Sequence, residues 1–265
     1  MYDEYLQFAK AIADRAGAVM LRYYGTKPSE DIKDDKTIVT IADKEINELV
    51  IESVKEAYPE HDIDGEEASH KVNGSSYVWV CDPIDGTNPF AMEIPVSVFS
   101  LALVKDGEPL VGVVYDPFNK KLYSAQKGGG AYCNTHQIHV SDQTLQPMVR
   151  VNFDWWKDAE YNIIDIVSEV SSLTGAYFLS PGSTTHMEMK VADGSFAASI
   201  FPGTKGKNVD IAAAKVIVEE AGGKVTDFTG NEQRYDEDIN GALVSNGIVH
   251  DDLIKHLSKL KGEQK

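Results

Sequence analysis

The fold is decided by one stretch of sequence, Trp79-Val80-Cys81-Asp82-Pro83-Ile84-Asp85-Gly86-Thr87-Asn88-Pro89-Phe90. The apolar residues 77–81 predict a buried strand, and the Pro and Gly that follow predict a tight turn at its end. Asp82 and Asp85 stand at that end, and two carboxylates so close together need a compensating cation. A divalent metal is the expected cation. The backbone donors of the turn and the hydroxyl of Thr87 suit phosphate chemistry.

Length and charge limit the classes of function. The chain has 265 residues, of which 42% are hydrophobic, so one or two domains with a sizeable core are expected. The net charge is −17 and the sequence pI is about 4.7. Nucleic acid and anionic lipid are therefore poor partners, because both would repel a polyanion.

Features of the sequence also indicate a cytoplasmic protein. The two cysteines, Cys81 and Cys133, do not form a disulfide framework of the secreted kind. Charged residues interrupt the N-terminal apolar residues, which is typical of an amphipathic helix rather than a signal peptide. The longest apolar stretch, residues 96–104, is too short to span a bilayer.

The first part of the chain predicts an α+β arrangement. Apolar residues recur at helical spacing from residue 6 to residue 20 and again in residues 40–58, while the polar residues 26–36 predict a mobile loop. Strands are expected at residues 61–64, 77–82, 97–105, 110–115 and 121–126. The pair Asp106-Gly107 predicts a hairpin, so two helices should pack on a largely antiparallel sheet.

The second part predicts an α/β layer, because strands and helices alternate. Helices are expected at residues 158–171, 183–191, 209–221 and 249–260, and strands at residues 149–153, 176–179, 196–200, 225–228 and 242–245. A boundary near Gln146-Pro147 divides the chain into an N-terminal α+β subdomain, residues 1–146, and a C-terminal α/β subdomain, residues 147–265.

Further carboxylates stand at the ends of predicted elements. Glu66 and Glu67 follow a short strand, Asp43 lies early in a helix, and Asp210 opens another. Hard oxygen ligands of this kind suit Mg²⁺, Mn²⁺ or Ca²⁺ and not zinc. For Asp43 alone, a partner of the helix dipole is an equally good interpretation. Three helix starts also carry small polar residues and could together hold an anion: residues 86–87, 182–183 and 208–210.

Taken in order, these motifs resemble the inositol monophosphatase family. They are Gly65-Glu66-Glu67, Asp82-Pro83-Ile84-Asp85-Gly86-Thr87, and Asp210-x-Ala212-Ala213 followed by Glu220-Ala221-Gly222-Gly223. The family belongs to the Mg²⁺-dependent, lithium-sensitive sugar phosphatases related to fructose-1,6-bisphosphatase. The resemblance implies a layered α-β-α-β-α fold, a homodimer, and two or three Mg²⁺ ions per site, for which Mn²⁺ could substitute.

The resemblance also implies a role for each matching residue. Glu66, Asp82, Asp85 and Asp210 would bind metal through carboxylates, and Ile84 through its carbonyl. Glu66 and Thr87 would activate the attacking water, with Glu67 and Asp43 in support. The remaining expected contacts are with the substrate: Asp85, Gly86, Thr87, Ser183, Thr184 and Lys205.

The sequence departs from the family in ways that concern the substrate. Val209 stands where many members have Trp, and residues 201–208 contain no acid but two lysines, Lys205 and Lys207. Either lysine could bind a second phosphate or lie in a solvated basic loop. The expected activity is hydrolysis of a small sugar or polyol phosphate, first inositol 1-phosphate. The alternatives are fructose 1,6-bisphosphate, 3′-phosphoadenosine 5′-phosphate and, from another class, a non-catalytic metal-binding interaction module.

Overall fold

The structure, a computed structural model, describes residues 2–26, 30–32, 38–72, 74–156, 159–203, 208–239 and 241–260. Its helices are α1 (Asp3–Tyr23), α2 (Ile41–Ala57), α3 (Thr87–Ala91), α4 (Ile164–Thr174), α5 (Thr184–Ala192), α6 (Ala212–Glu220) and α7 (His250–Leu257). An eight-stranded sheet contains β3 (Asp62–Gly65), β4 (Ser69–His70), β5 (Tyr77–Asp85), β6 (Val98–Lys105), β7 (Glu108–Asp116), β8 (Lys121–Gln126), β9 (Ala131–Cys133) and β10 (His136–Gln137). A five-stranded sheet contains β11 (Arg150–Phe153), β12 (Tyr177–Leu179), β13 (Ala198–Phe201), β14 (Lys224–Thr226) and β15 (Ala242–Ser245). A separate pair is formed by β1 (Glu30–Ile32) and β2 (Ile38–Thr40).

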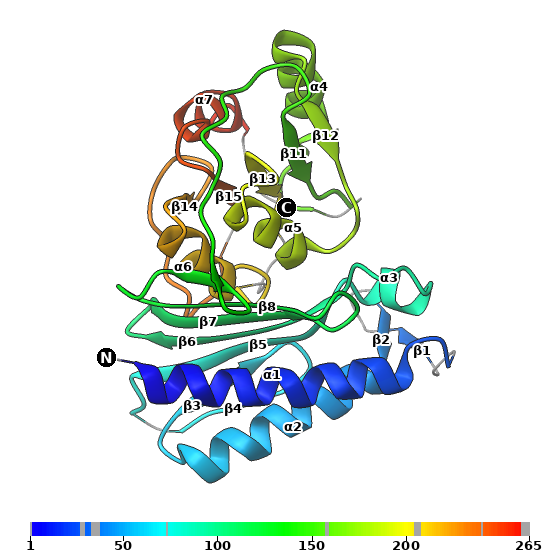
Figure 1. Cartoon of the computed structure of the whole chain (residues 1–265), viewed down its shortest axis with the longest axis vertical. Helices are drawn as coiled ribbons and strands as arrows, with labels where there is room; N and C mark the ends of the chain where they lie inside the picture. The colour runs from blue at the N-terminus through cyan, green and yellow to red at the C-terminus, as the bar shows by residue number, and fades with distance from the viewer. Residues whose placement is uncertain are drawn as a thin grey trace.

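These elements stack in layers (Figure 1). Helices α1 and α2 cover one face of the eight-stranded sheet, and α5 and α6 lie between the two sheets. Helices α4 and α7 cover the outer side of the five-stranded sheet. The α-β-α-β-α arrangement expected from the sequence is confirmed.

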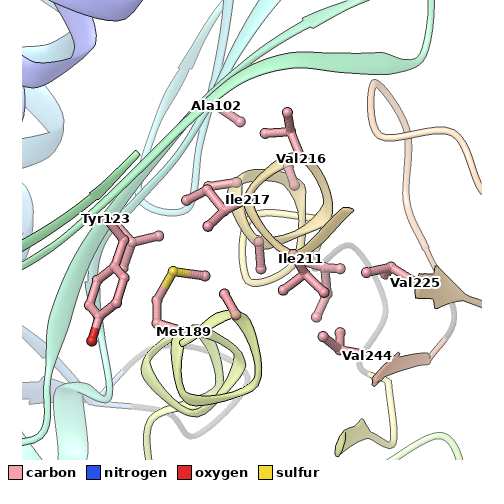
Figure 2. Packing of buried hydrophobic residues seen from close by; sticks show 14 of the residues in the cluster. Ala102, Tyr123, Met189, Ile211, Val216, Ile217, Val225 and Val244 are labelled. Atoms are coloured by element: carbon pink, nitrogen blue, oxygen red, sulfur yellow. The ribbon is translucent and has the colours of Figure 1, made fainter. Parts of the chain in front are cut away.

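Hydrophobic alternation along β5 explains how the inner layers are held together. Val78 and Val80 face the cluster that α5 and α6 cover, whereas Trp79 and Cys81 face the cluster that α1 and α2 cover. Successive side chains of a strand point to opposite faces, so a strand buried on both sides reads as a continuous apolar run. Figure 2 shows the cluster between the sheets, where Met189 of α5 and Ile217 of α6 meet.

The first sheet agrees with the sequence prediction. Its pairs are antiparallel except β3 with β5, which run parallel. The predicted helix at residues 40–58 is α2, and the Thr40 side chain caps it by accepting the N–H of Ala42. Strands β6 and β7 form the hairpin expected at Asp106-Gly107. The proposed boundary near residue 146 stays a prediction.

Two local predictions were wrong, and three short strands were missed. The helix expected from residue 158 begins at Ile164 instead, and Asn162 accepts the N–H of that residue. Part of the expected mobile loop forms β1, which pairs with β2. The short strands β4, β9 and β10 carry too few residues for a recognisable hydrophobic pattern and were not predicted.

Within the described ranges, no helix is both long enough and apolar enough to cross a membrane.

Candidate metal centre and active site

An irregularity in β5 brings its two aspartates to one place. Opposite β6, Asp82 pairs with Ser100 but Asp85 pairs with Val98, so β5 contains an extra residue between them. Residues three apart on a regular strand face opposite sides, and a bulge removes that alternation. Pro83 fits the bulge because it has no N–H to contribute to the ladder. The bulge therefore turns Asp82 and Asp85 toward the same site.

Asp210 completes a cluster of three carboxylates. One carboxylate oxygen from each of Asp82, Asp85 and Asp210 lies within 4.8 Å of the others. Asp82 and Asp85 are buried, and Asp210 is half-buried in the turn before α6. Carboxylate oxygens are the ligands that hard divalent cations prefer. This cluster could hold a metal ion, and it unites two of the three sequence motifs.

Asp85 also caps helix α5. Its carboxylate accepts hydrogen bonds from the Ser183 hydroxyl and from the N–H groups of Thr184 (3.2 Å) and Thr185 (2.9 Å). Burial raises the pKa of Asp85, and these hydrogen bonds oppose the shift. Thr185 continues the connection, because its hydroxyl donates to the carbonyl of Asp210 at 2.8 Å. The start of α5 therefore links two residues of the carboxylate cluster.

Gly86 allows the helix starts to approach one another. Its φ is +84°, and a Cβ there would lie 3.0 Å from Ser183 Cβ and 3.1 Å from the Gly182 carbonyl oxygen. Only glycine adopts this backbone without strain and without that contact. The starts of α3 and α5 therefore lie against each other, and the Thr185–Asp210 hydrogen bond adds the turn before α6, so the fold supplies the convergence that the sequence left open.

Asp43 joins the site through Thr87. The Thr87 hydroxyl lies 3.0 Å from the Ile84 carbonyl oxygen and 3.4 Å from Asp43 Oδ1. Asp43 Oδ2 accepts the N–H of Thr40 at 2.8 Å and its hydroxyl at 2.6 Å, which forms the capping box of α2. The pKa of Asp43 is raised to about 6, mainly by burial and to a smaller extent by the charges of Glu67 and Glu66, while the hydrogen bonds from Thr40 lower it. Asp43 therefore both caps its helix and faces the site.

Glu66 and Glu67 lie beside the cluster, at the end of β3. Because β3 runs parallel to β5 with Gly65 opposite Cys81, both strands end at the same edge. The N–H of Glu66 donates to the Cys81 carbonyl at 3.0 Å. Glu66 is not part of the tight group of three carboxylates found within the described ranges. Its predicted role as a metal ligand stays a prediction.

The structure describes only some of the residues that were predicted to contact the substrate. Ser183 and Thr184 are buried and bind Asp85, so the structure links them to the cluster. Lys205 and Lys207 lie outside the described residues.

Two buried acids near the site were not predicted. Asp154, which directly follows β11, has a pKa raised to about 7 by burial, opposed by hydrogen bonds from the side chains of Thr184 and Asn152. Glu188 on α5 is fully buried, and neither carboxylate oxygen has a hydrogen-bond partner in the part of the chain that the structure describes. Burial, then the charges of Asp154, Asp85 and Asp210, raise its pKa well above the usual value. Asp154 follows a strand as Asp82 does, which was a usable signal; Glu188 in mid-helix offered none.

Known proteins match this chain over nearly its whole length. The sequence model of the inositol monophosphatase family matches residues 1–261. A protein of Aquifex aeolicus named fructose-1,6-bisphosphatase/inositol-1-monophosphatase is 34% identical over 84% of this chain and 85% of its own. The solved structure of an IMPase from Thermotoga maritima superimposes with a TM-score of 0.86, at 27% identity, covering 97% of each chain.

A further similar structure is a LiCl-soaked inhibitory complex of a staphylococcal inositol monophosphatase. It superimposes with a TM-score of 0.84 at 25% identity and covers 97% of this chain and 95% of that chain. The match of motifs, sequence and fold is continuous from the first helix to the last. The chain therefore belongs to the inositol monophosphatase family and is a phosphoric monoester hydrolase.

Proposed function

We propose that this protein is a Mg²⁺-dependent phosphatase that hydrolyses monoesters of small sugars or polyols, with inositol 1-phosphate as its first substrate. The observation that carries the proposal is the meeting of Asp82, Asp85 and Asp210 within 4.8 Å, beside the Thr87 hydroxyl. Asp82 and Asp85 come from one strand end and Asp210 from a turn more than 100 residues later, so their meeting is a product of the fold.

The donor set fits magnesium. It consists of carboxylates and contains no sulfur or imidazole, which excludes the ligand pattern of structural zinc. Asp82, Asp85 and Asp210 would hold the cations, with Glu66 and the Ile84 carbonyl as further ligands. We infer two or three Mg²⁺ ions per site, with Mn²⁺ as a substitute. When bound, they would activate a water molecule and stabilise charge on the phosphate and the leaving oxygen.

The residues of the chain would orient the reacting groups. The Thr87 hydroxyl has one hydrogen, which it can donate to the Ile84 carbonyl or to Asp43, so its lone pairs are left to accept a hydrogen bond from water. Glu66 would act on the same water, with Glu67 in support. The backbone of Gly86 and Thr87 would hold the phosphate, and Ser183 and Thr184 at the start of α5 would contact the substrate.

The charge of the described site favours a polyol over a bisphosphate. The side chains that the structure brings together there are carboxylates and hydroxyls: the hydroxyls can exchange hydrogen bonds with a polyol, whereas the carboxylates would repel a second phosphate. Fructose 1,6-bisphosphate is the second candidate, supported by the name of the Aquifex relative. It would require a cation such as Lys205. 3′-Phosphoadenosine 5′-phosphate is the third.

One panel assay tests the proposal. Phosphate release is measured for inositol 1-phosphate, fructose 1,6-bisphosphate and 3′-phosphoadenosine 5′-phosphate, with Mg²⁺, with EDTA and with added Li⁺. We expect the first to have the highest kcat/KM, and we expect EDTA and Li⁺ to abolish release. Turnover that persists in EDTA would contradict the metal mechanism. Binding of Mg²⁺ without turnover of any substrate would favour the non-catalytic metal-binding module.

A homodimer is also part of the proposal. Large apolar side chains are exposed around β11, β12 and α4: Met148, Trp155, Leu173 and Tyr177. Such a group is typical of a subunit interface. Light scattering should give twice the mass of one chain, and Trp155→Ser should shift the protein toward the monomer. The cytoplasmic location stays a prediction.

A further inference from the structure

One side chain of α2, Asn47, fastens the loop that carries Glu66 and Glu67. Asn47 is 3% exposed, and its Nδ2 donates to the Ala68 carbonyl at 3.0 Å. Gly65 makes room for it, because a Cβ at Gly65 would lie 2.2 Å from Asn47 Oδ1. The two ends of the loop, Gly65 and Ala68, therefore both fit against the same amide.

The same face of α2 reaches the site at a second point. Asp43 precedes Asn47 by four residues, so the two side chains lie one turn apart on one face. Asp43 contacts Thr87, while Asn47 contacts the loop of Glu66 and Glu67. On its other side, that loop is bound to β5 through the N–H of Glu66. Helix α2 thus sets the spacing between Thr87 and Glu66.

Packing does not explain an asparagine at this position. Its apolar neighbours on the buried face of α2 are Ile46, Val50 and Val54. The other polar residues of that face, Asp43 and Ser53, have hydrogen-bond partners of their own. Asn47 Oδ1 is buried, and no donor among the described residues reaches it. A buried acceptor without a partner lowers stability, and asparagine is a weak helix former. A leucine here would suit the helix better, so the amide has another role.

We propose that Asn47 is a positioning residue that holds the Glu66 loop in place and thereby sets the affinity of the site for divalent cations. The inference rests on the proposed function, because it assigns Glu66 to the cation site. Mutation of residues that orient metal ligands without contacting the metal typically lowers metal affinity by about 10–100-fold.

The test compares Asn47→Leu and Asn47→Ala with a matched control on the same helix, Ser53→Ala. Ser53 is also buried on α2, donating to the Leu49 carbonyl at 2.7 Å and accepting from Arg15 at 3.0 Å, but it contacts no residue of the site. Mn²⁺ binding to the metal-free protein is measured by electron paramagnetic resonance, without substrate, and thermal unfolding is measured in EDTA.

We expect both Asn47 variants to bind Mn²⁺ at least about 10-fold more weakly. Asn47→Leu should keep the wild-type melting temperature or exceed it, whereas Ser53→Ala should lose stability and bind Mn²⁺ normally. A merely structural role would move stability and affinity together. Wild-type Mn²⁺ affinity in Asn47→Leu would overturn the inference. Failure of the proposed function has a different signature, because the wild-type protein would then bind Mn²⁺ but release no phosphate.

Discussion

The two sides of the carboxylate cluster are built differently. On the side of the eight-stranded sheet, hydrogen-bond donors hold the acids: Asp43 has two from Thr40, and Asp85 has three from residues 183–185. On the side of the five-stranded sheet, Asp154 accepts from the side chains of Thr184 and Asn152, with Asn152 Nδ2 at 3.4 Å from both of its oxygens. Glu188 has no hydrogen-bond partner among the described residues. Fixed donors orient a carboxylate before any ligand arrives, whereas a buried acid without donors resists ionisation until a cation lies close to it.

The difference suggests a division of labour. The side of the eight-stranded sheet fixes the orientation of its aspartates, because backbone N–H groups or hydroxyls donate hydrogen bonds to each of them. The second side supplies acids whose ionisation a nearby cation would favour, and the charge of Asp154 contributes to the raised pKa of Asp85. Since both favour a bound cation, each can be tested by changing one side while the other stays intact.

The largest effect is expected on the ordered side, from Asp85→Asn. The substitution removes a charge from the cluster and puts an amide N–H group against the donors at the start of α5. We expect kcat/KM to fall by more than about 100-fold, with a loss of about 1–3 kcal/mol in the free energy of unfolding. Phosphate release and urea unfolding measure the two effects.

The control is Asp227→Asn in the turn after β14. Asp227 likewise accepts two backbone N–H groups, from Thr229 and Asn231 at 2.8 Å each, but lies outside the cluster. It should lose stability while turnover stays normal. Undiminished turnover in Asp85→Asn would show that Asp85 has no role in the active site, and the comparison of the two sides would then be wrong.

The ordered side is also the one that the sequence predicts. The apolar run of β5, the Pro and Gly of its turn and the aspartates at its end lie within a dozen residues, so local rules suffice. The caps of α2 follow from Thr40 and Asp43, three residues apart. The start of α4 was missed because an Asn at position 162 outweighs an apolar pattern that begins earlier.

On neither side could the partners of the side chains be predicted, because they come from contacts between distant residues. The donors of Asp85 lie 98–100 residues away, and Asn47 reaches a carbonyl 21 residues later. The burial of Glu188 depends on how α5 sits between the sheets, which no pattern within α5 reveals. Motif order indicated that the segments meet; the partners of each side chain required the fold.

A second, smaller effect is expected in the pH dependence of stability without metal. The pKa values of Asp43 and Asp154 in the folded protein are raised to about 6 and about 7. The unfolded chain therefore releases these protons first, and folding loses stability as pH rises from about 4 to about 7. A bound divalent cation favours the ionised site and should reduce this loss.

Melting temperatures in EDTA and in Mg²⁺ across this range measure the effect. The gain from Mg²⁺ should be larger at about pH 7.5 than at about pH 5. The variant Asp154→Asn should make the EDTA profile flatter. If Mg²⁺ raised the melting temperature equally at both pH values, the bound cation would not influence the ionisation of these acids.

The smallest effect concerns Glu188 alone and bears on the second side directly. Methionine has nearly the same size and needs no partner, so Glu188→Met should raise the free energy of unfolding of the metal-free protein by about 1–3 kcal/mol. The raised pKa of Glu188 means that the wild-type group weakens folding more as pH rises above the ordinary glutamate range, so the gain should grow with pH.

Urea unfolding in EDTA measures whether Glu188→Met raises or lowers the free energy of unfolding. The variant for comparison is Glu219→Met on α6. Glu219 accepts from Lys215 at 2.6 Å, so its removal should destabilise the protein. The two substitutions are chemically identical, but Glu188 is fully buried whereas Glu219 is an exposed side chain paired with Lys215. If Glu188→Met also destabilised the protein, a buried donor or cation would have to lie beside Glu188. The buried acids on the side of the five-stranded sheet would then have partners, as those on the other side do. The proposed difference between the two sides would be wrong.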